Sequence, residues 1–424
     1  MATKSIKLNT TAARVGVIVL AILCVGVVYV FAKGFFANTI AARSIYKEIA
    51  EFSVALAPSD PQTHFASAVL YEKTFLPDDL PKSLAEFEQA TALSPSDFRL
   101  WFELGKARAR SGDTEGAEKA LRKALALAPN YSQIQWTLGN FLLRQGNESE
   151  AFALIRKAAE SDKIFASPAV ASAWQLFEGD TERMKSYTGE SVNLKAALAL
   201  LLAKEKRFDE ALVVWMSLPD TARKTDFKAD GTEIYQKMIE ARKYRAAIQV
   251  FSDAAESDEK TFALGKVTNG GFEANINPQN PGVFEWQIGE GVEPQIFVDK
   301  VQKHSGEISL VMILNNRDGK AFRNISQSVA VESNKKYVFE TFYKSDLKES
   351  PNTFRWEITD AADNNKILAS TDPVAQTADW TSLKTEFVAP PGTEAVTIRL
   401  ARVPCNTTLC PITGKLWFDD FSLN

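Results

Sequence analysis

Histidine and cysteine are the residue types that most often bind metals or act as nucleophiles, and this chain has few of them. Its 424 residues include two histidines, His64 and His304, which lie far apart in the sequence. A histidine-based catalytic triad or a multi-histidine metal site is therefore nearly excluded. The net charge of -4 gives no reason to expect nucleic acid as a partner, because nucleic-acid binding calls for a basic surface.

The three cysteines have two different settings. Cys24 lies inside an apolar run, where it is expected to behave as a small hydrophobic residue. Cys405 and Cys410 bracket a short loop whose spacing does not match the CxxC motif of zinc or redox sites. They are either two unrelated thiols or a local disulfide, and if the chain is exported we predict the disulfide.

The N-terminal region contains a candidate membrane span. Residues 15–32 carry no charge, and the apolar character resumes after Lys33 with Phe35 and Phe36. As a helix, this segment would reach across the ~30 Å hydrocarbon layer of a bilayer. A cleaved signal peptide, which has a shorter apolar region of ~7–15 residues, is the alternative, with a weak cleavage site at residues 30–32. We predict a retained transmembrane helix at residues 15–36.

The orientation of this helix is less clear than its position. Basic residues flank it almost equally, with Lys4, Lys7 and Arg14 before it and Lys33, Arg43 and Lys47 after it. The positive-inside rule is thus close to a tie. Because the tail of residues 1–14 is short and the cysteine pair suits an oxidising space, we predict a bacterial inner-membrane protein. Its N-terminus would be cytoplasmic and most of the chain periplasmic.

A repeat of 34 residues follows the candidate anchor. The pair Leu104-Gly105 recurs as Leu138-Gly139. Four further positions recur at the same spacing: Gly112 as Gly146, Ala117 as Ala151, Leu121 as Ile155, and Ala124 as Ala158. With Trp101 and Pro129, this pattern resembles the tetratricopeptide repeat, a pair of helices that stacks on its neighbours. We predict helical repeats over residues 40–260, with their number open, because the pattern weakens outside residues 62–165.

The resemblance implies a concave groove that binds protein. It places six side chains on the first helices of adjacent repeats: Phe102, Lys106, Arg110, Trp136, Asn140 and Arg144. Such basic and amide groups resemble those that hold an acidic peptide or a C-terminal carboxylate. We favour a simpler interpretation over a specific carboxylate-binding site: these residues form a solvated basic face, and the next helix covers Trp136. Protein binding in a more general sense is the prediction.

The hydrophobic pattern of the sequence changes after Lys260. Short alternating segments separated by turn residues take over, at residues 307–314, 326–331, 336–343, 353–359 and 396–401. This pattern predicts an all-β sandwich over residues 265–424. The whole chain is therefore expected to be a multidomain protein, with a single transmembrane helix, an all-α solenoid and an all-β jelly-roll sandwich.

Motifs spread along this last region resemble one family. They are Val267 to Glu273, Phe284-Glu285-Trp286, His304-Ser305-Gly306, Asp379-Trp380-Thr381 and Lys415 to Leu423. The ordered set resembles the galactose-binding-like jelly rolls, in particular carbohydrate-binding modules. The resemblance implies that Trp286, Trp380 and Trp417 belong to the core.

The same resemblance implies a structural calcium ion. Its ligands would be Glu273 and Asp419, with Asp420 as the fallback, since calcium prefers carboxylate and carbonyl oxygens. The alternative is a surface carboxylate pair on neighbouring first and last strands.

Sugar binding needs aromatic rings that stack on the sugar face, with polar groups beside them. The candidates are Tyr343 and Trp356 with the neighbouring Arg355. Trp356 alternates with Phe354 and Ile358, so a core position is the alternative for this ring.

These observations predict a non-enzymatic envelope scaffold, because no motif marks the paired carboxylates of a glycan-processing enzyme. The chain would bind protein through its repeats and glycan through its sandwich, in exopolysaccharide or cell-surface glycan assembly. The rival hypothesis is a pure assembly factor of secretion or polymerisation machinery, whose sandwich binds protein rather than sugar.

Overall fold

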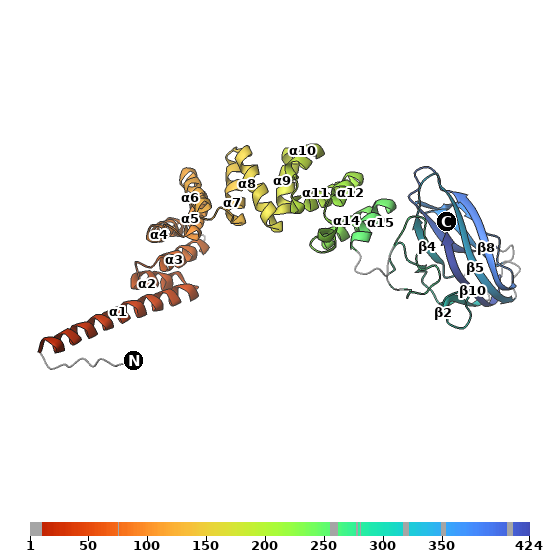
Figure 1. Ribbon diagram of the computed structural model, residues 1–424, viewed down its shortest axis with the longest axis horizontal. Coiled ribbons are helices and arrows are strands. Elements are labelled where there is room, and N and C mark those ends of the chain that lie inside the picture. Colours follow the sequence, from red (N-terminus) through yellow and green to blue (C-terminus); the bar gives the residue numbers. More distant parts are fainter. Residues whose placement is uncertain are drawn as a thin grey trace, which may run out of the picture. The chain divides into compact units, whose positions relative to one another are not determined.

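The computed structural model describes residues 11–74, 76–254, 262–276, 279, 281–316, 322–348, 353–404 and 410–424. These residues form two compact units, which divide between Ala173 and Trp174. The first unit is helical. The second contains further helices and the antiparallel sandwich (Figure 1).

The first unit is a series of helices joined by short turns. They are α1 (Thr11–Arg43), α2 (Lys47–Leu56), α3 (Pro61–Lys73), α4 (Asp79–Leu93), α5 (Phe98–Ser111), α6 (Thr114–Leu127), α7 (Ser132–Arg144) and α8 (Glu148–Ser161), then the short 3-10 helix η1 (Lys163–Phe165), with α9 (Ala166–Leu176) at the boundary. From α3 onward, the helices pair as α3/α4, α5/α6 and α7/α8. The predicted helical repeats are therefore confirmed.

Aspartates begin several of these helices. The side chains of Asp60, Asp97 and Asp113 accept hydrogen bonds from main-chain N–H groups in the first turns of α3, α5 and α6, at 2.9 to 3.0 Å. Each satisfies an N–H group that has no partner within its helix. Gly112 ends α5 with a φ of +85°, a conformation that glycine adopts without strain.

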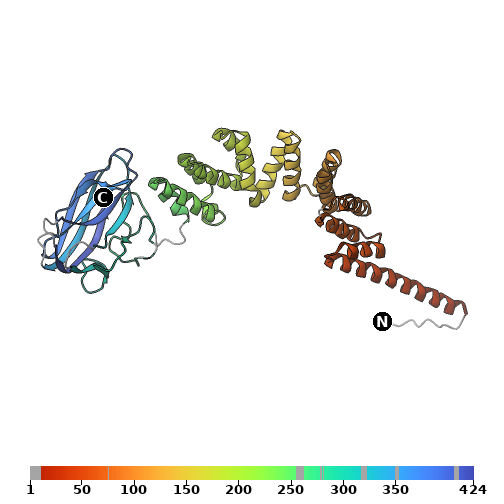
Figure 2. The ribbon, with the colours of Figure 1, turned by 180° about the vertical axis from the view of Figure 1, so that it is seen from behind.

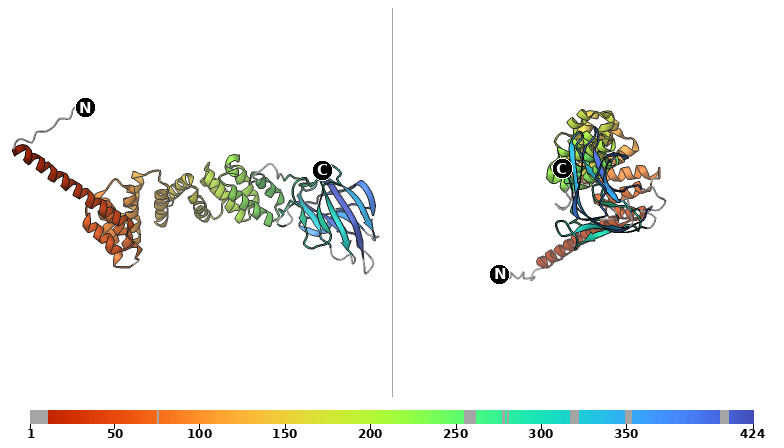
Figure 3. Two further views of the ribbon diagram at one scale, coloured as in Figure 1. Left: turned by 90° about the horizontal axis from the view of Figure 1, so that it is seen from below. Right: turned by 90° about the vertical axis from the view of Figure 1, so that its right-hand side faces the viewer.

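Helix α1 runs further than the predicted membrane span. It continues without a break to Arg43 (Figure 3). Ala37 and Ala41 in its last turns are buried. Asn38 Nδ2 donates a hydrogen bond to Asp60 Oδ2 at 3.0 Å, which ties α1 to the start of α3. The helix is long and apolar enough to cross a membrane by length and composition. Its last turns, however, pack within the helical fold.

The second unit begins with more helices. They are α10 (Thr181–Thr188), α11 (Val192–Lys204), α12 (Phe208–Met216), α13 (Asp220–Lys224), α14 (Lys228–Glu240) and α15 (Tyr244–Ala254). Trp215 on α12 is fully buried. A methyl group on Gly231 of α14 would lie 2.7 Å from the Trp215 ring, so the glycine leaves room for the indole.

Two five-stranded antiparallel sheets form the sandwich (Figures 1 and 2). The strands are β1 (Gln287–Ile288), β2 (Gln295–Asp299), β3 (Ser309–Asn316), β4 (Ile325–Ala330), β5 (Lys336–Lys348), β6 (Phe354–Asp360), β7 (Asp363–Ser370), β8 (Thr377–Val388), β9 (Ala395–Arg402) and β10 (Ile412–Leu423). The first sheet has the order β1-β4-β9-β6-β7, and the second has the order β2-β3-β10-β5-β8. The predicted all-β sandwich is confirmed.

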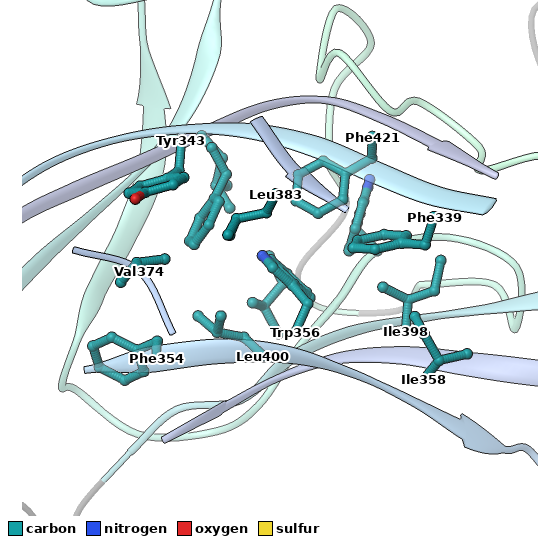
Figure 4. Close-up of a cluster of buried hydrophobic side chains, with 14 of the residues drawn as sticks. Phe339, Tyr343, Phe354, Trp356, Ile358, Val374, Leu383, Ile398, Leu400 and Phe421 are labelled. Atoms are coloured by element: carbon teal, nitrogen blue, oxygen red, sulfur yellow. The ribbon is translucent and has the colours of Figure 1, made fainter. Parts of the chain in front are cut away.

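The inner faces of the two sheets meet in one apolar core (Figure 4). Side chains alternate along each strand, so every second residue of β5 is buried from Tyr337 to Leu347. Of the three tryptophans expected in the core, Trp286 belongs to it. Trp417 is also buried, but it alternates with core residues of β10 and lies on the outer face of that strand. The third, Trp380, is only half-buried and lies near the surface.

Candidate functional site

The two rings predicted to stack on sugar lie in the core, and that prediction is wrong for both. Tyr343 is 4% exposed, and Trp356 is fully buried. Trp356 packs edge-on against Phe418 and Phe421, with ring centroids 5.1 and 4.8 Å away. Figure 4 shows Trp356 and Phe421 together in the core. On β6, Trp356 shares the inner face with Phe354, as strand alternation requires, so its ring cannot reach a ligand.

Arg355 has the opposite orientation, on the outer face of β6. Its Nη2 donates a hydrogen bond to Glu357 Oε1 at 2.8 Å, and Arg399 Nη2 on β9 donates to Glu357 Oε2 at 2.8 Å. Burial of Glu357 acts to raise its pKa, but the hydrogen bonds from Arg399 and Arg355 outweigh this effect and lower it. Arg355 therefore belongs to a charged group on the first sheet, in which Arg355 and Arg399 both bind the carboxylate of Glu357.

The second sheet carries a group of rings that sequence reasoning missed. The imidazole of His304 stacks on Phe342, with centroids 3.8 Å apart and planes 11° apart. The indole of Trp380 lies 5.7 Å from the same imidazole. His304 is exposed, whereas Phe342 and Trp380 are half-buried. We name His304, Phe342 and Trp380 the aromatic ledge.

Polar groups border the aromatic ledge. Lys344 Nζ lies 2.9 Å from Asp379 Oδ1, and Lys384 Nζ lies 2.9 Å from Glu340 Oε1. Ser382 Oγ also donates to Glu340 at 2.9 Å, and the register pairs Ser382 directly with Phe342. The ledge therefore combines ring surface with carboxylates, amines and a hydroxyl, the groups that sugar hydroxyls bind.

One signal in the sequence could have identified part of the ledge. Phe342 alternates with Thr341 and Tyr343, both of which are buried. Once Tyr343 is assigned to the core, Phe342 must point outward. Trp380 gave no such signal, because its motif led us to expect a core position.

The three carboxylates predicted to bind calcium gather around the loop between β2 and β3. Glu273 Oε1 accepts from the N–H of Glu307 at 2.8 Å, and Asp419 Oδ2 accepts from the N–H of His304 at 2.9 Å. Asp420 Oδ2 lies 2.6 Å from His304 Nδ1. Asp419 is fully buried, and this burial raises its pKa.

The chemistry of this group suits calcium better than its geometry does. Carboxylate oxygens are ligands that calcium prefers, and a methyl group on Gly271 would lie within 3.8 Å of atoms of all three acidic side chains. Main-chain N–H groups already donate to Glu273 and Asp419, and the side chains of His304 and Ser305 bind Asp420. Among the described residues, no group of three or more His, Cys, Asp or Glu side chains is placed to hold a metal ion. Calcium therefore stays a prediction.

The residues predicted to line the repeat groove have mixed surroundings. Phe102 is buried, and Lys106 Nζ lies 2.7 Å from Glu103 Oε2. Arg110 Nη2 lies 2.8 Å from Glu72 Oε1 on α3. Carboxylates of the same chain thus neutralise both cations, which argues against a preformed grip on a peptide carboxylate.

The corresponding residues of α7 include an exposed cation. The ring of Trp136 stacks on Phe165 of η1 at a centroid distance of 5.1 Å, so the following element covers part of it. Asn140 Nδ2 donates to the main-chain oxygen of Trp136 at 2.9 Å. Arg144, in the last turn of α7, is exposed. It offers charge to a partner more readily than Lys106 or Arg110.

The predicted disulfide involves a residue that the structure does not describe. Cys405 lies outside the described residues, whereas Cys410 is buried just before β10. The disulfide therefore stays a prediction.

Comparison with known families agrees with both predicted domain types. A tetratricopeptide repeat model matches residues 78–132 and 103–163, and a carbohydrate binding domain model matches residues 265–405. The chain thus contains tetratricopeptide repeats followed by a domain of the carbohydrate-binding kind. Both are non-catalytic kinds of domain.

Individual similar proteins cover one region each. The peroxisomal targeting signal receptor of Saccharomyces cerevisiae is 28% identical over 107 residues, which is 25% of this chain and 17% of that receptor. A solved structure described as "CBM4 structure and function" is 19% identical, with a TM-score of 0.28, and covers 37% of this chain and 98% of its own. A crystal structure of MamA protein is 18% identical, with a TM-score of 0.32, and covers 43% of this chain and 91% of its own. The chain spans about a sixth of the receptor's length.

Proposed function

We propose that this chain is a membrane-anchored scaffold of the bacterial envelope, which binds protein through its repeats and polysaccharide through its sandwich. The apolar, exposed surface of α1 supports the anchor. The matches to tetratricopeptide repeats and to a carbohydrate binding domain support the two binding roles. Assembly of exopolysaccharide or cell-surface glycan at the inner membrane is the setting that unites them.

The aromatic ledge is the observation that carries the glycan-binding part. Sugar faces stack on aromatic rings, and their hydroxyls need hydrogen-bonding groups at the edge of the ring. His304 and Trp380 present ring surface near solvent, with the Lys344–Asp379 ion pair beside them. The outer face of the first sheet offers Arg355 on β6 and Arg399 on β9, but both guanidinium groups already bind Glu357.

Binding through this ledge should be weak for a single sugar. Stacking of flat ligands on aromatic side chains contributes about 1–3 kcal/mol per ring, and a sugar face should give no more. Chains of several sugars are therefore needed, and monosaccharides should bind poorly. Because the contact is mainly not ionic, added salt should change the affinity little.

Titration of the full-length chain in detergent with long glycans tests the glycan-binding role. Trp380→Ala should weaken binding by about tenfold, which corresponds to a loss within the range for one ring. Arg355→Ala on the other sheet is the matched control and should bind as the unaltered chain does. If Arg355→Ala loses binding and Trp380→Ala does not, the glycan lies on the first sheet instead.

A second candidate function is a pure assembly factor whose sandwich binds protein. Phe297 and Val298 on the edge strand β2 are 47% and 40% exposed, and Val301 after it is exposed as well. Apolar side chains on a sheet edge are typical of surfaces that bind other chains. Absence of binding to any glycan, together with crosslinking of a partner to β2, would favour this function.

We also propose a structural calcium ion at Glu273 and Asp419, supported by the oxygen-rich group around Gly271. Calcium that binds only the folded chain raises the melting temperature. Addition of a chelator to the unaltered protein should therefore lower the melting temperature of the sandwich, and Asp419→Asn should remove that difference. Equal melting temperatures of the unaltered protein with calcium and with chelator would contradict the site.

A further inference from the structure

Helix α2 has an exposed apolar flank beside the C-terminal end of α1. Ile49 and Phe52 on α2 are 42% and 58% exposed, and Ile45 just before the helix is 75% exposed. Glu48 lies one helical turn before Phe52 and borders this flank, whereas Glu51 lies at least about 100° around the helix from Ile49 and Phe52. An exposed apolar flank of this kind indicates that another apolar surface covers it.

The packing of α2 fixes its level along α1. Ala50 and Ser53 of α2 are buried, as are Ala37 and Ala41 of α1, and the two helices are in contact. A connection of three residues, from Ser44 to Tyr46, makes the helices antiparallel neighbours. The hydrogen bond of Asn38 to Asp60 places the chain just after α2 at the level of Asn38.

This level coincides with the edge of the proposed membrane span. Asn38 lies two residues beyond Phe36, an axial rise of about 3 Å, and Ala41 lies about 7.5 Å beyond it. A bilayer has about 5–8 Å of interfacial layer on each side of its hydrocarbon core. The buried face of α2 packs on the end of α1, so in a membrane spanned by residues 15–36 Ile49 and Phe52 would lie at the depth of the lipid headgroups.

We propose that α2 is an interfacial helix, whose apolar flank formed by Ile45, Ile49 and Phe52 rests in the headgroup layer of the membrane that α1 spans. This proposal rests on the membrane anchor of the proposed function. The occupant is lipid, because the flank continues the exposed apolar surface of α1, where Phe35 and Phe36 are 75% and 61% exposed. Aromatic side chains favour this depth of a bilayer.

The consequence is that no flexible spacer separates the membrane from the repeats. α1 is unbroken from Thr11 to Arg43, and α2 and α3 pack directly on its end (Figure 3). The first helices of the array would stand on the bilayer surface, held by the anchor and by α2 together.

Fluorescence quenching of the full-length chain in lipid vesicles tests the proposal. Tryptophan is introduced at three positions: Phe52→Trp on the apolar flank, Glu51→Trp on the side of α2 away from that flank as the matched control, and Val25→Trp inside α1 as the probe of the anchor. The emission of the unaltered chain is subtracted. Vesicles contain lipids brominated either near the headgroup or near the chain ends.

We expect the added emission of Phe52→Trp to be lost mainly with bromine near the headgroup, that of Val25→Trp mainly with bromine near the chain ends, and that of Glu51→Trp to persist. If Phe52→Trp is quenched no more than Glu51→Trp while Val25→Trp is quenched, the anchor stands and the interfacial helix is rejected. If Val25→Trp is not quenched, both the anchor and the interfacial helix are rejected.

Discussion

At the scale of single residues, Glu357 on β6 binds Arg355 of its own strand and Arg399 of the neighbouring strand β9. Its side chain is 6% exposed and accepts hydrogen bonds from Arg355 and Arg399. Hydrogen bonds to charged groups stabilise by about 1.5–3 kcal/mol, so we predict that Glu357→Gln destabilises the sandwich by about 1–3 kcal/mol at neutral pH. Thermal unfolding followed by tryptophan fluorescence measures this. The matched control is Glu386→Gln, whose exposed pair with Lys336 should matter little.

The same carboxylate predicts how this loss depends on pH. Although burial opposes it, hydrogen bonding lowers the pKa of Glu357 below the ordinary value, so the unfolded chain binds its proton more readily than the folded one. The stabilisation is therefore present above the unfolded pKa of about 4.3 and is lost as the pH falls through the folded pKa. The difference in stability between the unaltered chain and Glu357→Gln should shrink below about pH 4. A constant difference down to pH 3 would contradict this assignment.

The sequence could predict residues of the candidate site only where strand alternation determines which face of the sheet a side chain occupies. Trp356 and Arg355 are neighbours, and strand alternation sends them to opposite faces of β6. Residue type led us to assign both to a ligand, and the alternation of Trp356 with Phe354 and Ile358 leaves a core position open as the alternative. His304 and Phe342 meet because the loop before β3 folds over β5, a contact between distant segments that no local pattern records.

At the scale of elements, the repeats depend on close contact between paired helices. A methyl group on Gly139 of α7 would lie 3.0 Å from the main-chain oxygen of Ala151 and 2.8 Å from Ile155 Cγ1. Alanine favours a helix over glycine by about 1 kcal/mol, but overpacking costs about 1–3 kcal/mol. We predict that Gly139→Ala is net destabilising, with a lower melting temperature in far-ultraviolet circular dichroism of the full chain.

The matched variant for this prediction is Gly105→Ala on α5. There, the two closest atoms are side-chain atoms of Leu121, at 2.7 and 2.9 Å, and the closest main-chain atom is Leu121 N at 3.1 Å. A side chain changes rotamer more readily than a helix backbone moves, so Gly105→Ala should be the milder of the two changes. Equal or reversed effects would show that the main-chain contact at Ala151 does not limit this helix pair.

Hydropathy predicted the existence of α1 but could not predict its end. The apolar run stops at Phe36, yet the helix continues to Arg43, because Ala37 and Ala41 pack against its neighbours. The repeats and the strands were easier to predict, since their spacing of small and large residues reflects local geometry. Helix capping by Asp97 and Asp113 supports the same boundaries.

At the scale of the whole molecule, the order of the parts follows from the sequence, because each part has its own periodicity. An uncharged run, a period of 34 residues and an alternation of two succeed one another along the chain. Tertiary contacts decide which surfaces remain available to a ligand. Packing buries the other candidate side chains, and it leaves exposed the aromatic ledge beside β5 and β8 and the apolar flank of α2.

The membrane anchor gives the prediction with the widest consequence for the molecule. On the insertion scale, each Val, Leu, Ile or Phe contributes about -0.3 to -0.6 kcal/mol, so residues 15–36 supply on the order of -5 kcal/mol. Two arginines near the centre, Val25→Arg with Val28→Arg, cost about 5–7 kcal/mol, enough to cancel this. We expect the double variant to leave the membrane pellet on carbonate extraction, whereas the unaltered chain and the control Ala12→Arg stay in it. If the unaltered chain is itself released, and its N-terminal sequence begins near Lys33, the segment is a cleaved signal and not an anchor.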